Sequence, residues 1–294
     1  MRDLEPRTGS VNPTSTGQLA NVFSVDVEDY YQVSAFEDTV SREDWTRFEP
    51  RVERNTHRIL DILSDRDTRA TFFILGWVAE HCPPLIREIA DRGHELASHG
   101  YDHQRITSQT PEQFRADIAK TKRILEDSAG IEVVGYRAPT YSIVHETLWA
   151  LEVILEEGYL YDSSIFPIRH DRYGIPKADR FPSIVKSTNG SELWEFPIST
   201  IRLAGLNLPF VGGGYMRQLP WTFVRWGMRR LNTHERQPAM VYIHPWELDP
   251  EQPRLDAGML NGIRHYRNLA ATKQRLSELL LDFEFTTART ALGL

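Results

Sequence analysis

The sequence predicts an α/β fold of roughly seven βα units in a single domain. From Asn21 onward, short apolar runs alternate with segments in which apolar residues recur at helical spacing, which is typical of a mostly parallel sheet. No repeat, linker or low-complexity segment interrupts this alternation after residue 20. We therefore expect one domain over residues 21–294, preceded by a flexible tail over residues 1–20.

The first part of the chain contains two complete βα steps. The run NVFSVDV predicts a strand over residues 21–27. Aliphatic side chains share one face of a predicted helix over 53–64, and the run ATFFILG predicts a buried strand over 70–76. A short helix over 84–92, which the following glycine ends, precedes a strand over 94–100.

The same alternation continues to the end of the chain. Thr110 as N-cap and Pro111 at the first helical position predict a helix that runs to about residue 128. The run VVGYRAP then predicts a strand over 133–139. The remaining predicted elements are a helix over 145–157, strands over 158–164 and 192–198, a helix over 221–233, a strand over 239–248, a helix over 271–281 and a strand over 283–288.

Composition excludes several classes of protein. Hydrophobic residues make up 40% of the 294 residues, as in ordinary soluble domains. A formal net charge of −7, from 34 basic and 41 acidic residues, argues against a nucleic-acid-binding protein. The one cysteine, Cys82, permits neither an intrachain disulfide nor a cysteine-rich zinc site. Any metal is therefore expected on His, Asp or Glu.

No membrane-spanning or export segment is predicted. Residues 1–19 are polar and lack the apolar stretch of a signal peptide. No later segment contains the roughly 18 consecutive apolar residues that a membrane helix needs. We therefore expect a cytoplasmic protein.

The first candidate site is the acidic motif SVDVEDY, which contains Asp26, Glu28 and Asp29. Residues i and i+2 of a strand point to one face, so Asp26 and Glu28 project together from the carboxyl end of the first strand. Ligands and catalytic groups of α/β folds gather at that end of the strands. A solvated acidic turn is the alternative interpretation of this motif.

A pair of histidines follows another predicted strand. His99 and His103 in SHGYDH have a spacing that places two imidazoles on one face of a helical turn, which suits a single cation with nitrogen ligands. Two exposed loop histidines are the alternative. Because both strands end at the same rim, the histidines and a carboxylate converge, with open positions for water and substrate.

Two further strand ends carry candidate catalytic groups. Arg137 in GYRAPTY is placed to form a bidentate pair with a carboxylate and to hold it ionised, although a surface salt bridge is the alternative. His244 ends the strand MVYIH, where an imidazole can donate a proton to a leaving amine. A core histidine on an apolar strand is the alternative for this residue.

Glycines and aromatic residues suggest where a saccharide binds. Gly213 and Gly214 precede Tyr215 and permit close approach of the backbone to a ligand, and Trp246 is suited to stacking on a sugar ring. A glycine turn and core aromatic side chains are the alternative. No Lys-Ser or Lys-Thr follows the glycines, so they do not form a phosphate loop.

Together these motifs resemble the polysaccharide deacetylase family of carbohydrate esterases, which contains chitooligosaccharide and peptidoglycan deacetylases. The acidic motif is followed in the family's order by GHELASHGYDH, GYRAPTY and IHPWE. The resemblance extends from about Asn21 to the end of the chain and implies a distorted (β/α)7 barrel. More narrowly, VDVEDYYQVSAF, GGGYMRQLP, YIHPWELDPEQPRL and HYRNL resemble the subgroup encoded with exosortase-linked exopolysaccharide loci.

The resemblance implies a role for each matching residue. His99 and His103 would bind a divalent metal, and Asp26, oriented by Arg137, would be the base that deprotonates the water on the metal. The backbone N–H of Tyr141 would stabilise the oxyanion. In addition, His244 would protonate the departing amine and Asp162 in YDSS would be the acid that tunes it.

The chain departs from the family pattern at one position. Many members carry two adjacent aspartates, base and then ligand, whereas Val27 follows Asp26 here and cannot bind a metal. Strand alternation favours Glu28 as the third ligand, and Asp29 is the alternative if the chain turns after Val27. Zinc is the expected metal, with cobalt or nickel as alternatives.

The resemblance therefore implies a metal-dependent hydrolase that removes N-acetyl groups from amino sugars of a polysaccharide or of its lipid-linked precursor. The expected partners are an N-acetylated saccharide and, peripherally, a membrane-bound glycan precursor, but no nucleic acid. Two alternatives remain: an amidase or cyclic-amide hydrolase of small molecules, and a non-catalytic carbohydrate-binding protein with a vestigial site.

Overall fold

The computed structural model describes residues 19–188, 190–256 and 258–294. Its centre is a sheet in which seven parallel strands follow the order β10-β1-β2-β3-β4-β5-β7. The predicted α/β fold with seven parallel strands is thereby confirmed. These strands are β1 (Asn21–Val27), β2 (Thr71–Ile74), β3 (Glu95–Ser98), β4 (Gly135–Tyr136), β5 (Tyr161–Asp162), β7 (Ser191–Glu195) and β10 (Met240–Ile243).

The sheet curves into a distorted, incompletely paired barrel. Within the described residues the hydrogen-bonded path from β10 to β7 does not join its two ends through strand pairing. Instead, the segment after β7 reaches β10, where the backbone N–H of Ser199 donates to the carbonyl oxygen of Met240 (3.4 Å). The Ser199 hydroxyl oxygen in turn accepts the N–H of Met240 at 2.8 Å.

Alternation along β1 decides which side chains face the barrel interior. All seven residues are buried. Phe23, Val25 and Val27 pack in the large core between the strands and the surrounding helices, whereas Val22 packs in a separate inner cluster. Because side chains of a strand alternate, Asp26 points with Val22 toward the interior, and Val27 points away from it.

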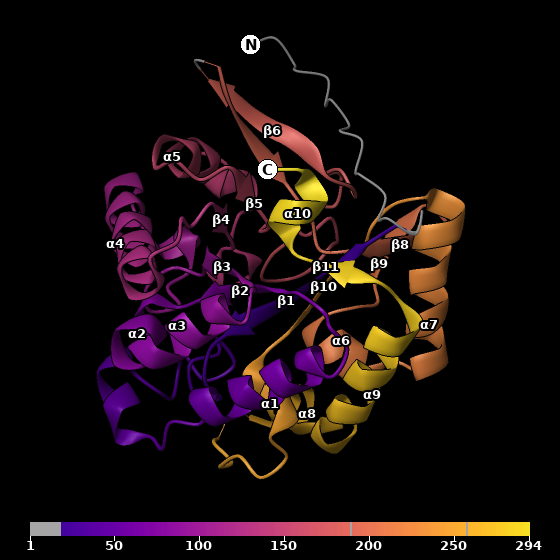
Figure 1. The fold of residues 1–294 in the computed structure, drawn as a ribbon, viewed down its shortest axis with the longest axis horizontal. Helices are drawn as coiled ribbons and strands as arrows, with labels where there is room; N and C mark the ends of the chain where they lie inside the picture. The colour runs from indigo at the N-terminus through magenta and orange to yellow at the C-terminus, as the bar shows by residue number, and fades with distance from the viewer. Residues whose placement is uncertain (1–18, 189, 257) are drawn as a thin grey trace.

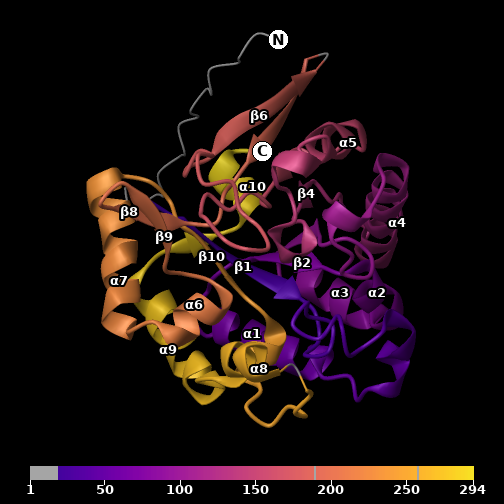
Figure 2. The ribbon, with the colours of Figure 1, turned by 180° about the vertical axis from the view of Figure 1, so that it is seen from behind.

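Helices surround the barrel (Figures 1 and 2). In both views α2, α3 and α4 lie on one side of the sheet, and α7 and α9 lie on the other. The helices are α1 (Val52–Ser64), α2 (Gly76–His81), α3 (Pro83–Asp91), α4 (Pro111–Ala129), α5 (Ala150–Glu156), α6 (Gly213–Gln218), α7 (Trp221–Arg229), α8 (Gly258–Tyr266), α9 (Leu269–Asp282) and α10 (Ala288–Leu292).

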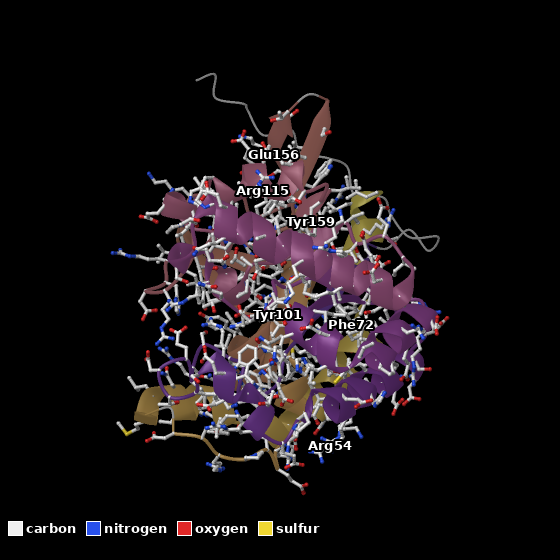
Figure 3. The ribbon with its side chains drawn as sticks, turned by 90° about the vertical axis from the view of Figure 1, so that its left-hand side faces the viewer. Arg54, Phe72, Tyr101, Arg115, Glu156 and Tyr159 are labelled. Atoms are coloured by element: carbon white, nitrogen blue, oxygen red, sulfur yellow. The ribbon has the colours of Figure 1, made fainter. Side chains whose placement is uncertain are left out.

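The longest of these helices, α4, follows its sequence signals closely. The Thr110 hydroxyl accepts the backbone N–H of Gln113, whose side chain bonds back to the Thr110 N–H, and Gly130 ends the helix with φ of 68°. Figure 3 shows Tyr159 behind α4, where its hydroxyl donates to the carbonyl oxygen of Ile118 at 3.0 Å. This bond fastens α4 to the segment that leads into β5.

The structure corrects several predicted boundaries. The strand predicted over 239–248 ends at Ile243, because Pro245 starts a 3₁₀ turn, η6 (Pro245–Leu248). The helix predicted over 221–233 passes into a π-helical turn, η5 (Arg230–Glu235). The helix predicted over 145–157 divides into the 3₁₀ turn η4 (His145–Thr147) and α5.

Other elements were absent from the sequence-based prediction. They are three hairpin strands, several short helices and three 3₁₀ turns: β6 (Ser183–Thr188), which pairs antiparallel with β7; β8 (Thr200–Leu203) with β9 (Leu206–Pro209); α2, α6, α8 and α10; and η1 (Arg42–Arg47), η2 (Ile106–Ser108) and η3 (Pro139–Tyr141). The strand predicted over 283–288 is present but shorter, as β11 (Phe285–Thr286). The hairpin of β6 and β7 projects from the body beside α10 (Figures 1 and 2).

The predicted tail lies outside the described residues, apart from Leu19 and the buried Ala20. Across the part of the chain that the structure describes, no helix combines the length and apolar character needed to cross a membrane.

Candidate active site

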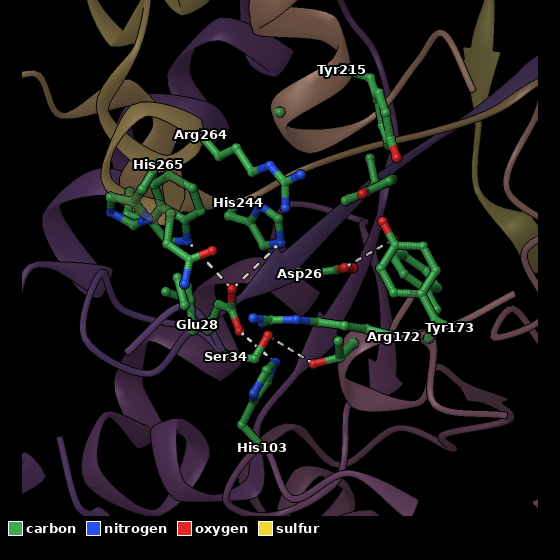
Figure 4. A pocket seen from close by; sticks show the side chains of 18 of the residues that line it. Asp26, Glu28, Ser34, His103, Arg172, Tyr173, Tyr215, His244, Arg264 and His265 are labelled. Atoms are coloured by element: carbon green, nitrogen blue, oxygen red, sulfur yellow. Dashed lines mark hydrogen bonds and ion pairs between the residues drawn. The ribbon is translucent and has the colours of Figure 1, made fainter. Parts of the chain in front are cut away.

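A pocket of about 480 Å³ opens at the carboxyl ends of the parallel strands. Asp26 and Glu28 reach it from the end of β1, His99 follows β3, and His244 follows β10. Figure 4 shows Asp26, Glu28, His103 and His244 facing one another across this space. The structure therefore brings together side chains that come from three separate motifs of the sequence.

Three of these residues could hold a metal. Ligand atoms of Glu28, His99 and His103, all buried, lie within 4.8 Å of one another. Nδ1 of His99 lies 2.8 Å from the carbonyl oxygen of Arg137, which leaves Nε2 to face the site. Oε2 of Glu28 is buried without a hydrogen-bond partner, 3.0 Å from Nε2 of His103. This donor set suits a divalent cation such as zinc.

The cluster is electrostatically polarised even without a cation. Burial would raise the pKa of Glu28, but the neighbouring His103 and His244 lower it to about 2. Burial lowers the pKa of His99 to about 4. At neutral pH the site therefore offers an ionised carboxylate and a neutral imidazole, the forms in which both residues bind metals.

Asp29, the alternative third ligand, faces away from the histidines. Its Oδ2 accepts the backbone N–H groups of Arg51 (2.6 Å) and Val52 (2.9 Å) at the start of α1. Its Oδ1 accepts the N–H of Tyr30 at 2.8 Å. Asp29 is thus a helix-capping residue in this structure, and the geometry favours Glu28 as the third ligand.

Asp26 is held by Arg137, as the sequence predicts. Nη1 of Arg137 lies 2.5 Å from Oδ1 of Asp26 and 2.9 Å from the Ser24 hydroxyl. The guanidinium is fully buried, stacks over the Phe73 ring at 3.9 Å, and donates its other N–H groups to Ser163. Such complete anchoring fixes the position of the Asp26 carboxyl group at the floor of the pocket.

Tyr141 lies beside this pair in an unusual backbone conformation. Thr140 and Tyr141 both have positive φ, 55° and 52°, in the turn that follows Arg137. The Tyr141 hydroxyl approaches Oδ2 of Asp26 at 3.5 Å. Its backbone N–H, which the resemblance assigned to the oxyanion, donates to the carbonyl oxygen of Ala138 at 3.0 Å. The oxyanion role of this N–H therefore stays a prediction.

His244 is supported by two buried charged residues. Its Nδ1 lies 2.8 Å from Oε1 of Glu247, and the other Glu247 oxygen pairs with Nε of Arg217. Burial alone would lower the pKa of His244, but the carboxylates of Glu28 and Glu247 raise it to about 9. A protonated His244 is therefore available as a proton donor at neutral pH.

The carboxylate that contacts His244 is not the one that was expected. Asp162 was expected to tune His244, but its Oδ1 accepts the Ser164 hydroxyl at 2.5 Å and its neighbour is Glu195. Glu247 occupies the expected place instead. The i to i+3 spacing of His244 and Glu247 in HPWE was a usable sequence signal, whereas no local signal pointed to Arg217.

The predicted saccharide-binding residues divide into two groups. Gly214, Tyr215 and Trp246 line the pocket, as expected. Gly213 lies behind them, where a Cβ atom would meet the Tyr242 hydroxyl at 3.1 Å, so its small size serves packing against that ring. Trp246 stacks between His244 and His265, with ring centroids at 5.1 and 4.0 Å.

Three features lie at one rim of the βα barrel: a buried carboxylate–arginine pair, a Glu-His-His cluster and a histidine supported by a carboxylate. Together they are typical of metal-dependent hydrolases. Comparison with family models makes the class specific: residues 36–154 match the polysaccharide deacetylase family. The predicted resemblance to this family is thereby confirmed over residues 36–154. Residues 163–293 match a second model, described as Domain of unknown function (DUF3473).

Curated relatives agree with this assignment. A peptidoglycan-N-acetylglucosamine deacetylase of Bacillus cereus is 37% identical over 98 residues, 33% of this chain and 36% of that protein. A peptidoglycan deacetylase of Helicobacter pylori is 27% identical over 141 residues, 48% of this chain and 47% of that protein. The chain thus spans between a third and a half of the length of these relatives.

Solved structures support the fold over nearly the whole chain. A candidate polysaccharide deacetylase from Mycobacterium smegmatis aligns with a TM-score of 0.61 at 21% identity, covering 96% of this chain and 92% of that one. A peptidoglycan N-acetylglucosamine deacetylase aligns with a TM-score of 0.50 at 15% identity, covering 93% and 88%. The predicted deacetylase-type α/β fold is confirmed by the first of these alignments.

Proposed function

We propose that this protein is a metal-dependent hydrolase that removes N-acetyl groups from amino sugars of a saccharide. The observation that carries the proposal is the position of the Glu28, His99 and His103 cluster beside the buried Asp26–Arg137 pair. The names of the curated relatives, which are deacetylases of N-acetylglucosamine or peptidoglycan, support the same chemistry.

A division of roles follows from the contacts of each side chain. A divalent cation bound by Glu28, His99 and His103 supplies Lewis-acid chemistry, because it polarises a carbonyl and makes water more acidic. Asp26, held in position by Arg137, accepts a proton from the attacking water. His244 donates its proton to the departing nitrogen, so the amide C–N bond breaks to give acetate and a free amine.

We further propose that the substrate belongs to exopolysaccharide biosynthesis, as a polysaccharide or its lipid-linked precursor at the cytoplasmic face of a membrane. Helix α8, which contributes Arg264 to the pocket wall, exposes Met259 (79%), Leu260 (69%) and Ile263 (51%). Large apolar residues beside arginine are typical of segments that rest on anionic lipid.

The test is flotation of the protein with anionic vesicles. Flotation that is lost in a Met259→Ser/Leu260→Ser variant would support this contact, and equal flotation of the wild-type protein and the variant would contradict it.

A small-molecule amidase is the second candidate function, because the same catalytic groups serve any accessible amide. The open pocket of about 480 Å³ favours a saccharide. A vestigial binding protein is less consistent with the complete set of acid, base and ligand side chains.

Acetate release from an N-acetylglucosamine oligomer tests the proposal. The purified protein is compared after chelation, after zinc restoration, and as the Asp26→Asn variant. Asp127→Asn, an exposed carboxylate on α4, is the matched control. We expect release that requires both zinc and Asp26 and is unchanged in the control. Zinc-loaded protein that releases no acetate from any saccharide would refute the proposed function.

A further inference from the structure

Two arginines of the pocket remain without a counter-charge. Asp26 is neutralised by Arg137, and Arg217 is neutralised by Glu247. Arg172 and Arg264 also line the pocket, yet among the ion pairs and hydrogen bonds of the described residues neither guanidinium has an acidic partner. Even the adjacent Asp171 pairs with His170 instead, at 2.9 Å. The chain as a whole is acidic, with a net charge of −7.

The loop that carries Arg172 is held by stacked rings. The ring of Tyr173 stacks on His170 at 3.8 Å and on Phe166 at 5.8 Å. Tyr173 also meets Tyr141 edge-on at 5.9 Å, which ties the loop to the active-site turn. Arg172 therefore extends from a braced segment of the pocket wall rather than from a free loop.

Helix α8 holds Arg264 from the other wall. The carbonyl oxygen of Arg264 accepts N–H groups from Arg217 (3.1 Å) and Gln218 (3.4 Å) of α6. These bonds fix the backbone at Arg264, and its side chain lines the pocket. In Figure 4 its guanidinium lies near His244, while Arg172 enters from the side of Tyr173.

The charges of the two guanidiniums both affect His170 in the pocket wall. Burial lowers the pKa of His170, and the nearby Asp171 opposes this effect. The positive charges of Arg264 and Arg172 lower the pKa further. Both guanidiniums add positive charge to the wall of one concave site, which favours a ligand that supplies negative charge. Guanidinium groups bind carboxylate and phosphate oxygens in a bidentate manner, which makes these the matching ligand groups.

We propose that the pocket recognises an anionic saccharide, whose carboxylate or phosphate is bound by Arg172 and Arg264 while its acetamido group lies at Glu28, His99 and His103. This inference rests on the proposed function and specifies its substrate. The carboxylate would come from a uronic acid residue next to the N-acetylated sugar. The phosphate would come from a sugar phosphate or from a nucleotide- or lipid-linked sugar.

The test compares three substrates with the zinc-loaded protein: an N-acetylglucosamine hexamer, a hexasaccharide of alternating N-acetylglucosamine and glucuronate, and N-acetylglucosamine 1-phosphate. We expect kcat/KM for acetate release to be at least about tenfold higher for one of the two anionic substrates than for the neutral hexamer. Preference for the hexasaccharide would identify a carboxylate ligand, and preference for the sugar phosphate would identify a phosphate ligand.

Variants assign the effect to the two arginines. Arg172→Gln and Arg264→Gln should each raise KM for the preferred anionic substrate by about tenfold, with little change for the neutral hexamer. Arg169→Gln and Arg267→Gln are matched controls, because both are exposed arginines near the same segments that do not line the pocket. Equal kinetics for neutral and anionic substrates, unaffected by either pocket variant, would overturn the inference.

A binding titration separates this inference from the proposed function. If no substrate releases acetate, calorimetric titration of wild-type protein with each anionic compound still reports on the pocket. Binding that is lost in the Arg172→Gln/Arg264→Gln double variant, and kept in the control variants, would support anion recognition by a protein without the proposed activity. No binding of either compound would overturn it.

Discussion

Glu247 controls His244 through contacts buried beneath the pocket. Burial would raise the pKa of Glu247, but the charges of Arg217 and His244 lower it to about 2, so the carboxylate is ionised at any physiological pH. Its bond to Nδ1 of His244 fixes the ring orientation and leaves Nε2 directed toward Glu28, at 3.4 Å. Arg217 also donates to the carbonyl oxygens of His265 and Arg264, which ties this arrangement to α8.

We predict that Glu247→Gln lowers kcat for acetate release by roughly 10²-fold while KM changes little. The amide cannot stabilise a protonated His244, so the proton donor is lost although the pocket keeps its shape. Steady-state kinetics on the N-acetylated oligomer measure the effect, with the nearby exposed Glu251→Gln as control. A variant with unchanged kcat would show that His244 does not act through Glu247.

Glu28 and Asp29 are adjacent acids with different expected functions. We predict that Glu28→Gln weakens zinc binding by at least about 100-fold, because it removes the only anionic member of the Glu-His-His cluster. Asp29→Ala should instead destabilise the fold by about 1–3 kcal/mol, since three buried N–H groups lose their acceptor. Zinc titration and urea unfolding of both variants measure this. The opposite pattern would assign the ligand to Asp29.

Single residues were predictable where their partners lie within a local motif. His99, His103, Arg137 and His244 follow strand ends at short spacings, and the sequence placed them correctly at one rim. The choice between Glu28 and Asp29 depends on N–H groups more than 20 residues away, at the start of α1. Such a contact exists only after the chain has folded, so local spacing could favour one acid without excluding the other.

At the scale of elements, Asp117 of α4 shapes the loop between His99 and His103. Its carboxylate accepts the backbone N–H of Tyr101 at 3.1 and 3.2 Å. Gly100 lies so close that a Cβ atom would be 3.2 Å from Oδ1 of Asp117, and its φ of 71° favours glycine. Helix α4 therefore supports the loop from outside the barrel.

The pKa of Asp117 predicts a pH-dependent stability. Burial raises it from 3.8 to about 7. Between these values the folded protein holds a proton at Asp117 that the unfolded chain has lost, so the contribution of Asp117 to the free energy of unfolding decreases as pH rises from about 4 to 7. Asp117→Asn, which keeps an acceptor for Tyr101, should make this decrease smaller. Urea unfolding across that pH range checks the prediction against Asp127→Asn, and equal slopes would contradict it.

Elements were predictable where capping signals and periodicity coincided, as in α4, and less so elsewhere. Strand β6, the antiparallel partner of the predicted strand β7, escaped prediction because it is largely half-buried or exposed and lacks a continuous apolar run. Strands β4 and β5 comprise only two residues each, since the chain leaves the sheet early to place Arg137 and Ser163. Tertiary contacts therefore override the longer strands that local hydrophobicity suggested.

For the molecule as a whole, both matched regions build one site. The polysaccharide deacetylase match over 36–154 contains His99, His103 and Arg137, whereas the match over 163–293 contains His244 and the arginines of the pocket wall. One sheet runs through both regions, because β1, which precedes the first match, pairs with both β2 and β10. Strand β5, which lies between the two matches, likewise pairs with both β4 and β7. The region of unknown function thus belongs to the same folding unit.

We therefore predict that a fragment ending at residue 160 neither unfolds cooperatively nor binds zinc tightly. Removing β10 exposes one edge of β1 and uncovers the interior face that Met240 and Tyr242 cover, so the strand that carries Glu28 is no longer held beside the histidines. Thermal unfolding followed by circular dichroism, together with zinc titration, compares the fragment with the full chain. A fragment that melts cooperatively and binds zinc like the full chain would contradict this prediction. The region before residue 160 would then be an independent domain, and the region after it would only supply the proton donor and the pocket wall.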